Sequence, residues 1–101
     1  IGRYFPSDDE KWKDCSSDRF LKDIVQELKM NNYEIINIDT TIILREPIIT
    51  PYIHKIKQKL APLMGIKENH ISVKATTTDG LGFVGKSEGW SAFSIATLMK
   101  K

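Results

Sequence analysis

The chain has a single cysteine and no long apolar run, and each absence narrows the class of protein. With Cys15 alone among 101 residues, no intrachain disulfide can form, which fits a reducing compartment. No stretch approaches the ~20 apolar residues that a membrane-spanning helix needs. With 41% hydrophobic and 28% charged residues, the composition is ordinarily globular. We therefore expect one soluble domain over residues 1–101.

The sequence also has little of the patterning that would identify a nucleic-acid partner, a histidine metal site or a covalent nucleophile. A net charge of +2 falls short of the basic excess typical of nucleic-acid-binding domains. His54 and His70 have no further ligand at metal-site spacing. No Ser-His-Asp or Cys-His arrangement is evident, and Cys15 beside Asp14 lacks positive neighbours that activate a thiol. None of these three functions is therefore predicted from these residues.

The first third of the chain predicts a loop and then a helix. Residues 1–16 combine Pro6 with serine and aspartate residues, which favours turns. Ser17 is expected to cap the helix, with Asp18 in its first turn. The apolar stripe of this helix is Phe20, Leu21, Ile24, Val25 and Leu28. The helix should end near residues 31 and 32, two asparagines that tolerate left-handed backbone.

The middle of the chain predicts a strand followed by a helix. Tyr33–Leu44 is rich in β-branched residues, which favours a long strand. Pro47 interrupts it, and Thr50 with Pro51 at the first helical position is expected to open the helix. The apolar face of this helix is Ile53, Ile56, Leu60, Leu63 and Met64.

The last third predicts two further strands. Pro62 should kink the preceding helix or end it early, and Gly65 fits the position after its C-terminus. Ile71–Thr76 then predicts a strand. The tail "WSAFSIATLMK" fits both periodicities, but Phe93 and Ile95 alternate with small residues, and a strand is favoured. The fold class expected from this order is α+β, a mixed β-sheet with helices packed on one face. So short a chain has too few helices for both faces, so the other face is expected to be buried against another subunit.

The stretch "VKATTTDGLGFVGKSEG", residues 73–89, contains the groups that a diphosphate site needs. Hydroxyls of Thr76, Thr77 and Thr78 can donate to phosphate oxygens, and the Asp79 carboxylate can hold a divalent cation. Glycines at 80, 82 and 85 allow close backbone approach, and Lys86 can neutralise phosphate charge. Threonine-rich strands and glycine-spaced turns are also common without any ligand.

Two further loops are weaker candidates. In "FPSDD", Asp8 and Asp9 beside Phe5 could accept hydrogen bonds from polyol hydroxyls, or could form a solvated turn. "LREPIIT" contains Pro47 and is followed by Pro51; because these prolines lack N–H donors, backbone groups are left exposed that could contact a base edge, or the segment could be a connector.

Together, these segments resemble one family, 2-C-methyl-D-erythritol 2,4-cyclodiphosphate synthase. The resemblance runs along essentially the whole chain. It depends on "IG" and "FPSDD" within residues 1–9, "SSDRFL" at 16–21, "NIDTTII" at 37–43, "REPIITPYI" at 45–53 and the stretch at 73–89. Its elements KATTT, LGF and G-basic-x-E-G at fixed spacing are the most specific.

The resemblance implies a homotrimer with active sites between subunits, which agrees with the sheet face that is expected to be buried. It also implies the conversion of 4-diphosphocytidyl-2-C-methyl-D-erythritol 2-phosphate to the 2,4-cyclodiphosphate with release of CMP, in non-mevalonate isoprenoid biosynthesis. Such an enzyme is a phosphorus-oxygen lyase. The attack is intramolecular, so the protein must mainly position the substrate and neutralise charge, and no covalent nucleophile is needed.

The family's site residues carry over to matching positions. Thr77 matches the threonine assigned to transition-state stabilisation, and Asp79 stands where a glutamate usually holds magnesium or manganese. The positions implied to contact the methylerythritol phosphate are Ile1, Gly2, Phe5, Pro6, Ser7, Asp8 and Asp9. Those implied to enclose cytosine are Leu44, Arg45, Glu46, Pro47, Ile48, Ile49, Thr50, Ala75 and Thr76. The remaining implied substrate contacts are Thr77, Thr78, Asp79, Phe83 and Lys86.

Several positions depart from the family pattern. Asp79 is one methylene shorter than glutamate, Lys86 replaces a bidentate arginine, and Ile48 stands where a lysine is common. The Asp-x-His pair and further His that hold zinc in the family do not occur in this sequence. We therefore expect an N-terminal metal-binding segment upstream of Ile1.

Two other classes of function stay open at this stage. One is a non-catalytic trimeric module that binds a cytidine nucleotide, and the other is an interaction domain in which residues 76–89 form an oligomer contact. A bacterial cytoplasm is the expected location, with a plastid-type organelle as the alternative. Neither a nucleic acid nor a membrane is expected as partner.

Overall fold

The computed structural model describes residues 3, 5, 8, 10–12 and 16–101. The elements in chain order are a 3₁₀ turn η1 (Glu10–Trp12), α1 (Ser17–Met30), β1 (Tyr33–Ile43), η2 (Thr50–Tyr52), α2 (Ile53–Met64), η3 (Glu68–His70), β2 (Ile71–Thr76), α3 (Gly82–Gly85) and β3 (Ser91–Lys100). This is an α+β fold, as expected. In the described part of the chain, no helix is long and apolar enough to cross a bilayer.

The ends of α1 and α2 are set by local hydrogen bonding. The Ser16 hydroxyl accepts a hydrogen bond from the Asp18 N–H at 3.3 Å, so Ser16, not the expected Ser17, caps α1. Asn32 has a φ of 65°, the left-handed conformation expected where α1 ends. The second helix continues through Pro62 to Met64, so the proline does not stop it, and it ends at Gly65 with a φ of 68°.

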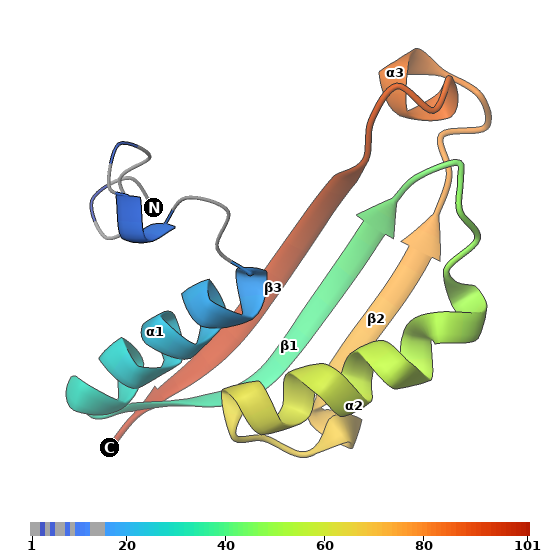
Figure 1. Cartoon of the computed structure of the whole chain (residues 1–101). Coiled ribbons are helices and arrows are strands. Elements are labelled where there is room, and N and C mark those ends of the chain that lie inside the picture. The colour runs from blue at the N-terminus through green and yellow to red at the C-terminus, as the bar shows by residue number, and fades with distance from the viewer. Residues whose placement is uncertain (1–2, 4, 6–7, 9, 13–15) are drawn as a thin grey trace.

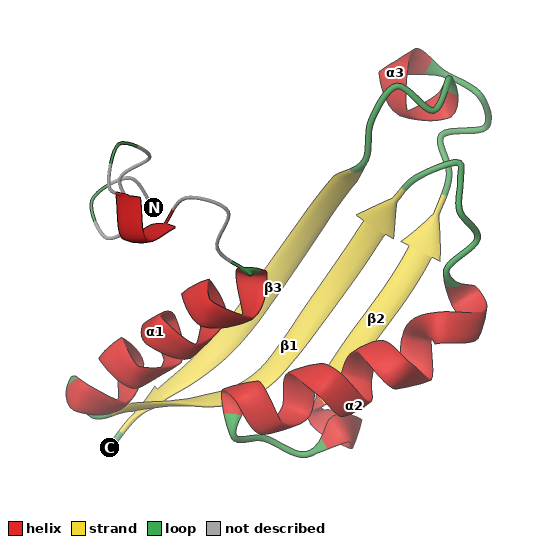
Figure 2. Ribbon diagram, in the orientation of Figure 1, coloured by secondary structure: helices red, strands yellow, loops and turns green. Residues whose placement is uncertain are grey.

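Three strands form one mixed sheet in the order β2-β1-β3 (Figure 2). β1 and β2 are parallel, with Ile38 opposite Ile71 and Ile43 opposite Thr76. β1 and β3 are antiparallel, with a register shift between residues 35 and 37. The tail is therefore a strand, as the alternating pattern predicted.

The helices pack on one face of the sheet. The most buried core residues are Val25 of α1, Ala61 and Met64 of α2, and Ile71 and Val73 of β2. Partly buried residues packed against them are Leu21, Ile35, Ile38, Ile42, Ile53, Ile56, Leu60 and Ile66. Most of the predicted apolar stripes thus face this core, whereas Ile24 of the α1 stripe is 42% exposed. The helix spacing that we derived from the sequence is therefore largely correct.

The opposite sheet face is open in the described chain. Residues paired across strands share a face, so Asp39, Ser72 and Ile95 form one row of the open face, and Lys74 and Phe93 belong to the next. Phe93 and Ile95 are 67% and 72% exposed. The sheet face without helices, which was expected to pack against another subunit, is therefore exposed in the described chain. Its side chains are polar on β2 and apolar on β3.

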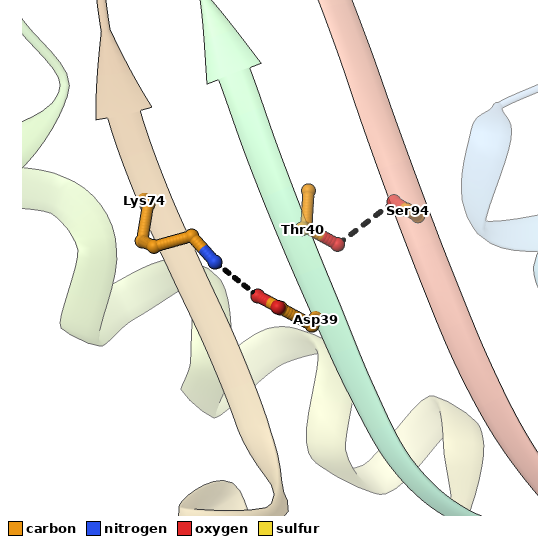
Figure 3. A network of polar contacts seen from close by, with 4 residues as sticks. All are labelled: Asp39, Thr40, Lys74 and Ser94. Atoms are coloured by element: carbon orange, nitrogen blue, oxygen red, sulfur yellow. Dashed lines mark hydrogen bonds and ion pairs between the residues drawn. The ribbon is translucent and has the colours of Figure 1, made fainter.

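Polar contacts link the strands (Figure 3). Lys74 of β2 pairs with Asp39 of β1, and the hydroxyls of Thr40 and Ser94 lie 2.8 Å apart across β1 and β3. Hydrogen bonding to the Lys74 ammonium is the main cause that lowers the pKa of the Asp39 carboxyl.

Candidate active site

Two of the three candidate loops converge at one end of the sheet. β1 and β2 are parallel and end side by side at Ile43 and Thr76, so the segments that follow leave the same sheet edge (Figure 1). β3 begins there too, because Ser91 pairs with Ile43. We call residues 44–50 and 77–90 the loop end. The Leu44 N–H donates to the Thr76 carbonyl at 3.1 Å, which extends the sheet pairing into the loop end.

The threonine run forms a compact turn with distinct roles for its hydroxyls. The Thr78 hydroxyl donates to the Leu81 carbonyl at 2.6 Å, and the Leu81 N–H returns a hydrogen bond to the Thr78 carbonyl at 3.1 Å. The Asp79 N–H donates to the Thr77 hydroxyl oxygen at 3.0 Å. Because the Thr77 hydroxyl only accepts among the described residues, its proton stays available for an outside acceptor. Of these two hydroxyls, Thr77 is the one poised to donate to a ligand.

The conformation of the turn explains its glycines. Gly80 and Gly82 have φ values of 83° and 69°, which other residues rarely adopt. Asp79, at a φ of 55°, shares this left-handed conformation, which aspartate tolerates better than most residues. Gly85 is required for space, since a Cβ there would lie 2.2 Å from the carbonyl carbon of Gly80. The short helix α3 therefore packs backbone against backbone on the Asp79 turn.

The loop end contains two buried apolar side chains, whereas its candidate ligand-binding side chains are exposed. Leu44 and Val84 are 4% and 5% exposed. By contrast, Asp79 and Lys86 are exposed, and Phe83 is 57% exposed. A carboxylate, an ammonium and an aromatic ring thus lie on one short loop, accessible to a ligand.

The 44–50 segment is attached to this loop by Arg45. The Arg45 guanidinium donates to the Gly85 carbonyl at 3.2 Å. Glu46 and Pro47 are joined by a cis peptide bond and are exposed, as are Ile48 and Thr50, while Ile49 is half-buried. The Ala75 side chain, at the end of β2, is also half-buried. The segments predicted to enclose cytosine therefore lie next to those predicted to hold the diphosphate.

The third candidate loop lies elsewhere in the chain. Ile1, Gly2, Pro6, Ser7 and Asp9 fall outside the described residues. Phe5 packs edge-to-face on Phe20 of α1, with ring centroids 4.9 Å apart, and Asp8 is exposed. In Figure 1 the described part of this segment lies beside the start of α1, well apart from α3. Within one chain, the described part of the N-terminal segment therefore does not lie next to the loop end.

The described residues fit the two metals expected from the sequence to different degrees. In the part of the chain that the structure describes, no three His, Cys, Asp or Glu side chains gather as a metal site. These residues therefore do not fit a protein-built zinc centre. A single exposed carboxylate such as Asp79 does fit magnesium bound mainly by water and phosphate oxygens.

Sequence reasoning missed three features of the loop end. Val84 is buried within α3, Arg45 bonds to a backbone carbonyl forty residues away, and Ser87 has a φ of 60°. Composition gave no clear signal for Val84, because Leu81 and Phe83 in the same stretch are equally apolar but exposed.

These features define an α+β domain with a ligand-accessible loop end, and comparison with known proteins places it in a family. The model of the YgbB family matches residues 1–99. The chain therefore belongs to the YgbB family, the family of 2-C-methyl-D-erythritol 2,4-cyclodiphosphate synthases. The resemblance drawn from the motifs is confirmed.

Individual relatives agree with this membership. The chain is 40% identical over 101 residues to 2-C-methyl-D-erythritol 2,4-cyclodiphosphate synthase of Moorella thermoacetica, and 45% identical to that of Clostridium novyi. All of the chain is covered, but only 62% and 64% of these relatives. The bifunctional IspDF of Campylobacter jejuni matches with a TM-score of 0.94 and 32% identity, over 100% of this chain and 27% of that one. The IspF–CDP complex of Plasmodium falciparum matches with a TM-score of 0.86 and 29% identity, over 100% and 60%.

Proposed function

We propose that the chain is the nucleotide- and diphosphate-binding part of a 2-C-methyl-D-erythritol 2,4-cyclodiphosphate synthase. The substrate is 4-diphosphocytidyl-2-C-methyl-D-erythritol 2-phosphate, and the products are the cyclodiphosphate and CMP. The observation that carries the proposal is the family match over residues 1–99 combined with two family loops at one sheet edge. The chain covers 62% and 64% of the curated relatives, so the complete reaction is proposed for a protein of their full length.

The proposed chemistry is an intramolecular phosphoryl transfer. An oxygen of the 2-phosphate forms a bond to the β-phosphorus, and the bond from that phosphorus to the oxygen bridging the α-phosphate breaks, so that CMP leaves with the electron pair. The protein must hold the attacking and leaving oxygens in line and stabilise charge on the equatorial oxygens. Thr77 donates its hydroxyl proton to that charge, and Lys86 supplies a positive charge close to it.

Nucleotide recognition is assigned to the 44–50 segment with Ala75 and Thr76. Backbone groups of this segment beyond Leu44 lie in a loop next to the turn that carries Asp79. The similarity to an IspF–CDP complex supports a cytidine diphosphate ligand for this chain.

We further assign the chain to a homotrimer with the site between subunits. The exposed apolar side chains of β3, Phe93 and Ile95, provide a surface for a second copy. Phe5 packs on Phe20 of α1, and α1 lies apart from the loop end (Figure 1), which supports the same arrangement, because a methylerythritol contact from the N-terminal segment would then come from a neighbouring subunit.

Two metals belong to the proposal. Asp79 would hold magnesium or manganese, which would neutralise charge on the diphosphate when bound. The described residues do not form a zinc site, so none of them is assigned to zinc.

The test is CMP release by this chain and by a version extended upstream, each with zinc and magnesium. We expect turnover from the extended protein and CDP binding by the chain. If the extended protein binds CDP but never cyclises the substrate, the alternative function, a non-catalytic cytidine-nucleotide-binding trimeric module, replaces the enzyme.

Variants of Thr77 and Asp79 distinguish the enzyme and the nucleotide-binding module from a purely structural domain. Thr77→Ala should lower the rate of CMP release about 100-fold, the usual loss of one transition-state donor, while Thr77→Ser retains most of it. Asp79→Ala should weaken CDP binding in the presence of magnesium, measured by calorimetry. An interaction domain predicts no CDP affinity in the wild type and therefore none to lose.

A further inference from the structure

Arg45 connects two segments that are assigned to different halves of the ligand. Its guanidinium donates to the Gly85 carbonyl at 3.2 Å, in a partly buried contact. Arg45 lies in the 44–50 segment, which is assigned to the nucleotide, whereas Gly85 ends α3 and directly precedes Lys86. The contact therefore joins the nucleotide segment to the peptide unit that carries Lys86.

The Gly85 peptide unit is held from two sides within residues 77–90, which we call the diphosphate loop. On one side, the Gly85 α-carbon packs against Gly80, which follows Asp79. On the other side, the next three N–H groups return to α3, from Lys86 to Gly82 at 3.2 Å, from Ser87 to Val84 at 3.0 Å and from Glu88 to Phe83 at 2.8 Å. A shift of the Gly85 peptide unit would therefore move Asp79 and Lys86 together.

Arg45 is suited to fix this peptide unit rather than to bind the ligand directly. A guanidinium is always charged, and a charged donor makes a stronger hydrogen bond to a carbonyl than a neutral donor does. The carbonyls at the end of a helix lack intrahelical partners, so Arg45 satisfies one of them at the end of α3. The adjacent Leu44 is 4% exposed and donates its N–H to Thr76, which holds the base of the arginine in place.

We propose that Arg45 is a positioning residue that makes ordering of the nucleotide segment and of the diphosphate loop interdependent. The inference rests on the proposed function for the identity of the two ligand halves. By linkage, occupancy of one half then raises affinity for the other by the same factor. This role differs from the direct cytosine contact that the family resemblance implied for Arg45.

The first measurement is hydrogen exchange in the ligand-free chain. Arg45→Met keeps the length of the side chain but removes the donors, and the N–H groups of residues 86–88 should exchange about tenfold faster, as expected from loss of one hydrogen bond. Arg45→Lys should restore part of the protection. Lys55→Met, which removes one positive charge from an exposed position of α2, is the matched control and should change none of these rates. Unchanged exchange at residues 86–88 in Arg45→Met would overturn the inference.

The second measurement is calorimetry with cytidine and with inorganic pyrophosphate, separately and together. In the wild type, saturating pyrophosphate should tighten cytidine binding at least about fivefold, within the usual range of coupling. Arg45→Met should abolish this coupling, so that saturating pyrophosphate no longer changes the affinity for cytidine. A large loss of cytidine affinity with coupling intact would instead make Arg45 a direct nucleotide contact and would refute the positioning role. If the wild type binds neither probe, the proposed function fails, and the exchange rates still decide whether Arg45 positions the loop.

Discussion

The helix-covered body of the sheet and the loop end depend on different kinds of contact. In the body, apolar side chains such as Val25, Met64 and Ile71 are removed from water between the helices and the sheet. In the loop end, only Leu44 and Val84 of the large side chains are nearly buried, among the described residues. Order there comes from backbone hydrogen bonds, from the close approach of Gly85 to Gly80 and from the Arg45 contact.

This difference matters for stability and for binding. Burial of apolar area is the dominant favourable term in folding, so the body should unfold as one cooperative unit. A segment with few buried apolar contacts opens locally at a lower cost, and binding loops commonly come from such segments. The loop end can therefore be perturbed without unfolding the body, whereas core changes should affect the whole chain.

The largest expected effect is in the body. Ile71 is 2% exposed at the centre of the core, so Ile71→Ala should lower the free energy of unfolding by about 2–5 kcal/mol. The measurement is urea unfolding followed by circular dichroism. Met30→Ala is the control, because Met30 is 71% exposed, and its effect should stay within about 0.5 kcal/mol. A loss below about 1 kcal/mol for Ile71→Ala would contradict the assignment of the core.

A smaller and local effect is expected in the loop end. Gly85→Ala would place a Cβ 2.2 Å from the Gly80 carbonyl carbon, so one backbone segment must move away. Overpacking of this kind costs about 1–3 kcal/mol, and we expect it to appear as a loss of CDP affinity of about tenfold or more. The urea midpoint of the body should change little.

Gly89→Ala is the matched control for this substitution. A Cβ at residue 89 would lie 3.2 Å from the ring of Phe83, an exposed side chain that has room to shift. Its effect on CDP affinity should therefore be the smaller of the two. An equal loss in both variants, or a large fall in the urea midpoint for Gly85→Ala, would remove the distinction between the loop end and the body.

The difference between the body and the loop end also explains which features of the fold could be predicted from the sequence. The elements of the body were predicted because apolar spacing records burial, and β2 was predicted at its observed bounds, Ile71–Thr76. The ends of elements that are set by a single hydrogen bond were predicted less accurately. Adjacent serines at 16 and 17 offer the same capping chemistry, and only the backbone conformation of Ser16 decides between them.

The candidate site was predicted by motif but not by geometry. The residue types at 76–86 indicated a diphosphate site, and the family resemblance singled out Thr77. Composition and spacing alone do not distinguish Thr77, whose hydroxyl only accepts among the described residues, from Thr78, whose proton is used within the turn. The Arg45 contact spans forty residues and ends on a backbone carbonyl, which is the same in every residue type. Such contacts leave no trace in composition or spacing.

The smallest effect is expected for the ion pair on the open sheet face, where no apolar core contributes. The Lys74 ammonium lowers the pKa of the Asp39 carboxyl, so the contribution of the pair is complete above the unfolded-state pKa of aspartate and is lost as pH falls through the lower folded-state pKa. Both side chains are about half exposed, at 53% and 52%, so the change in stability should be slight. Carboxyl NMR titration should give a midpoint for Asp39 below that of ordinary aspartates, and Lys74→Met should raise it. If Lys74→Met leaves the Asp39 midpoint unchanged, the pair does not persist in solution, and the open face of the body has no electrostatic link between β1 and β2 at this position.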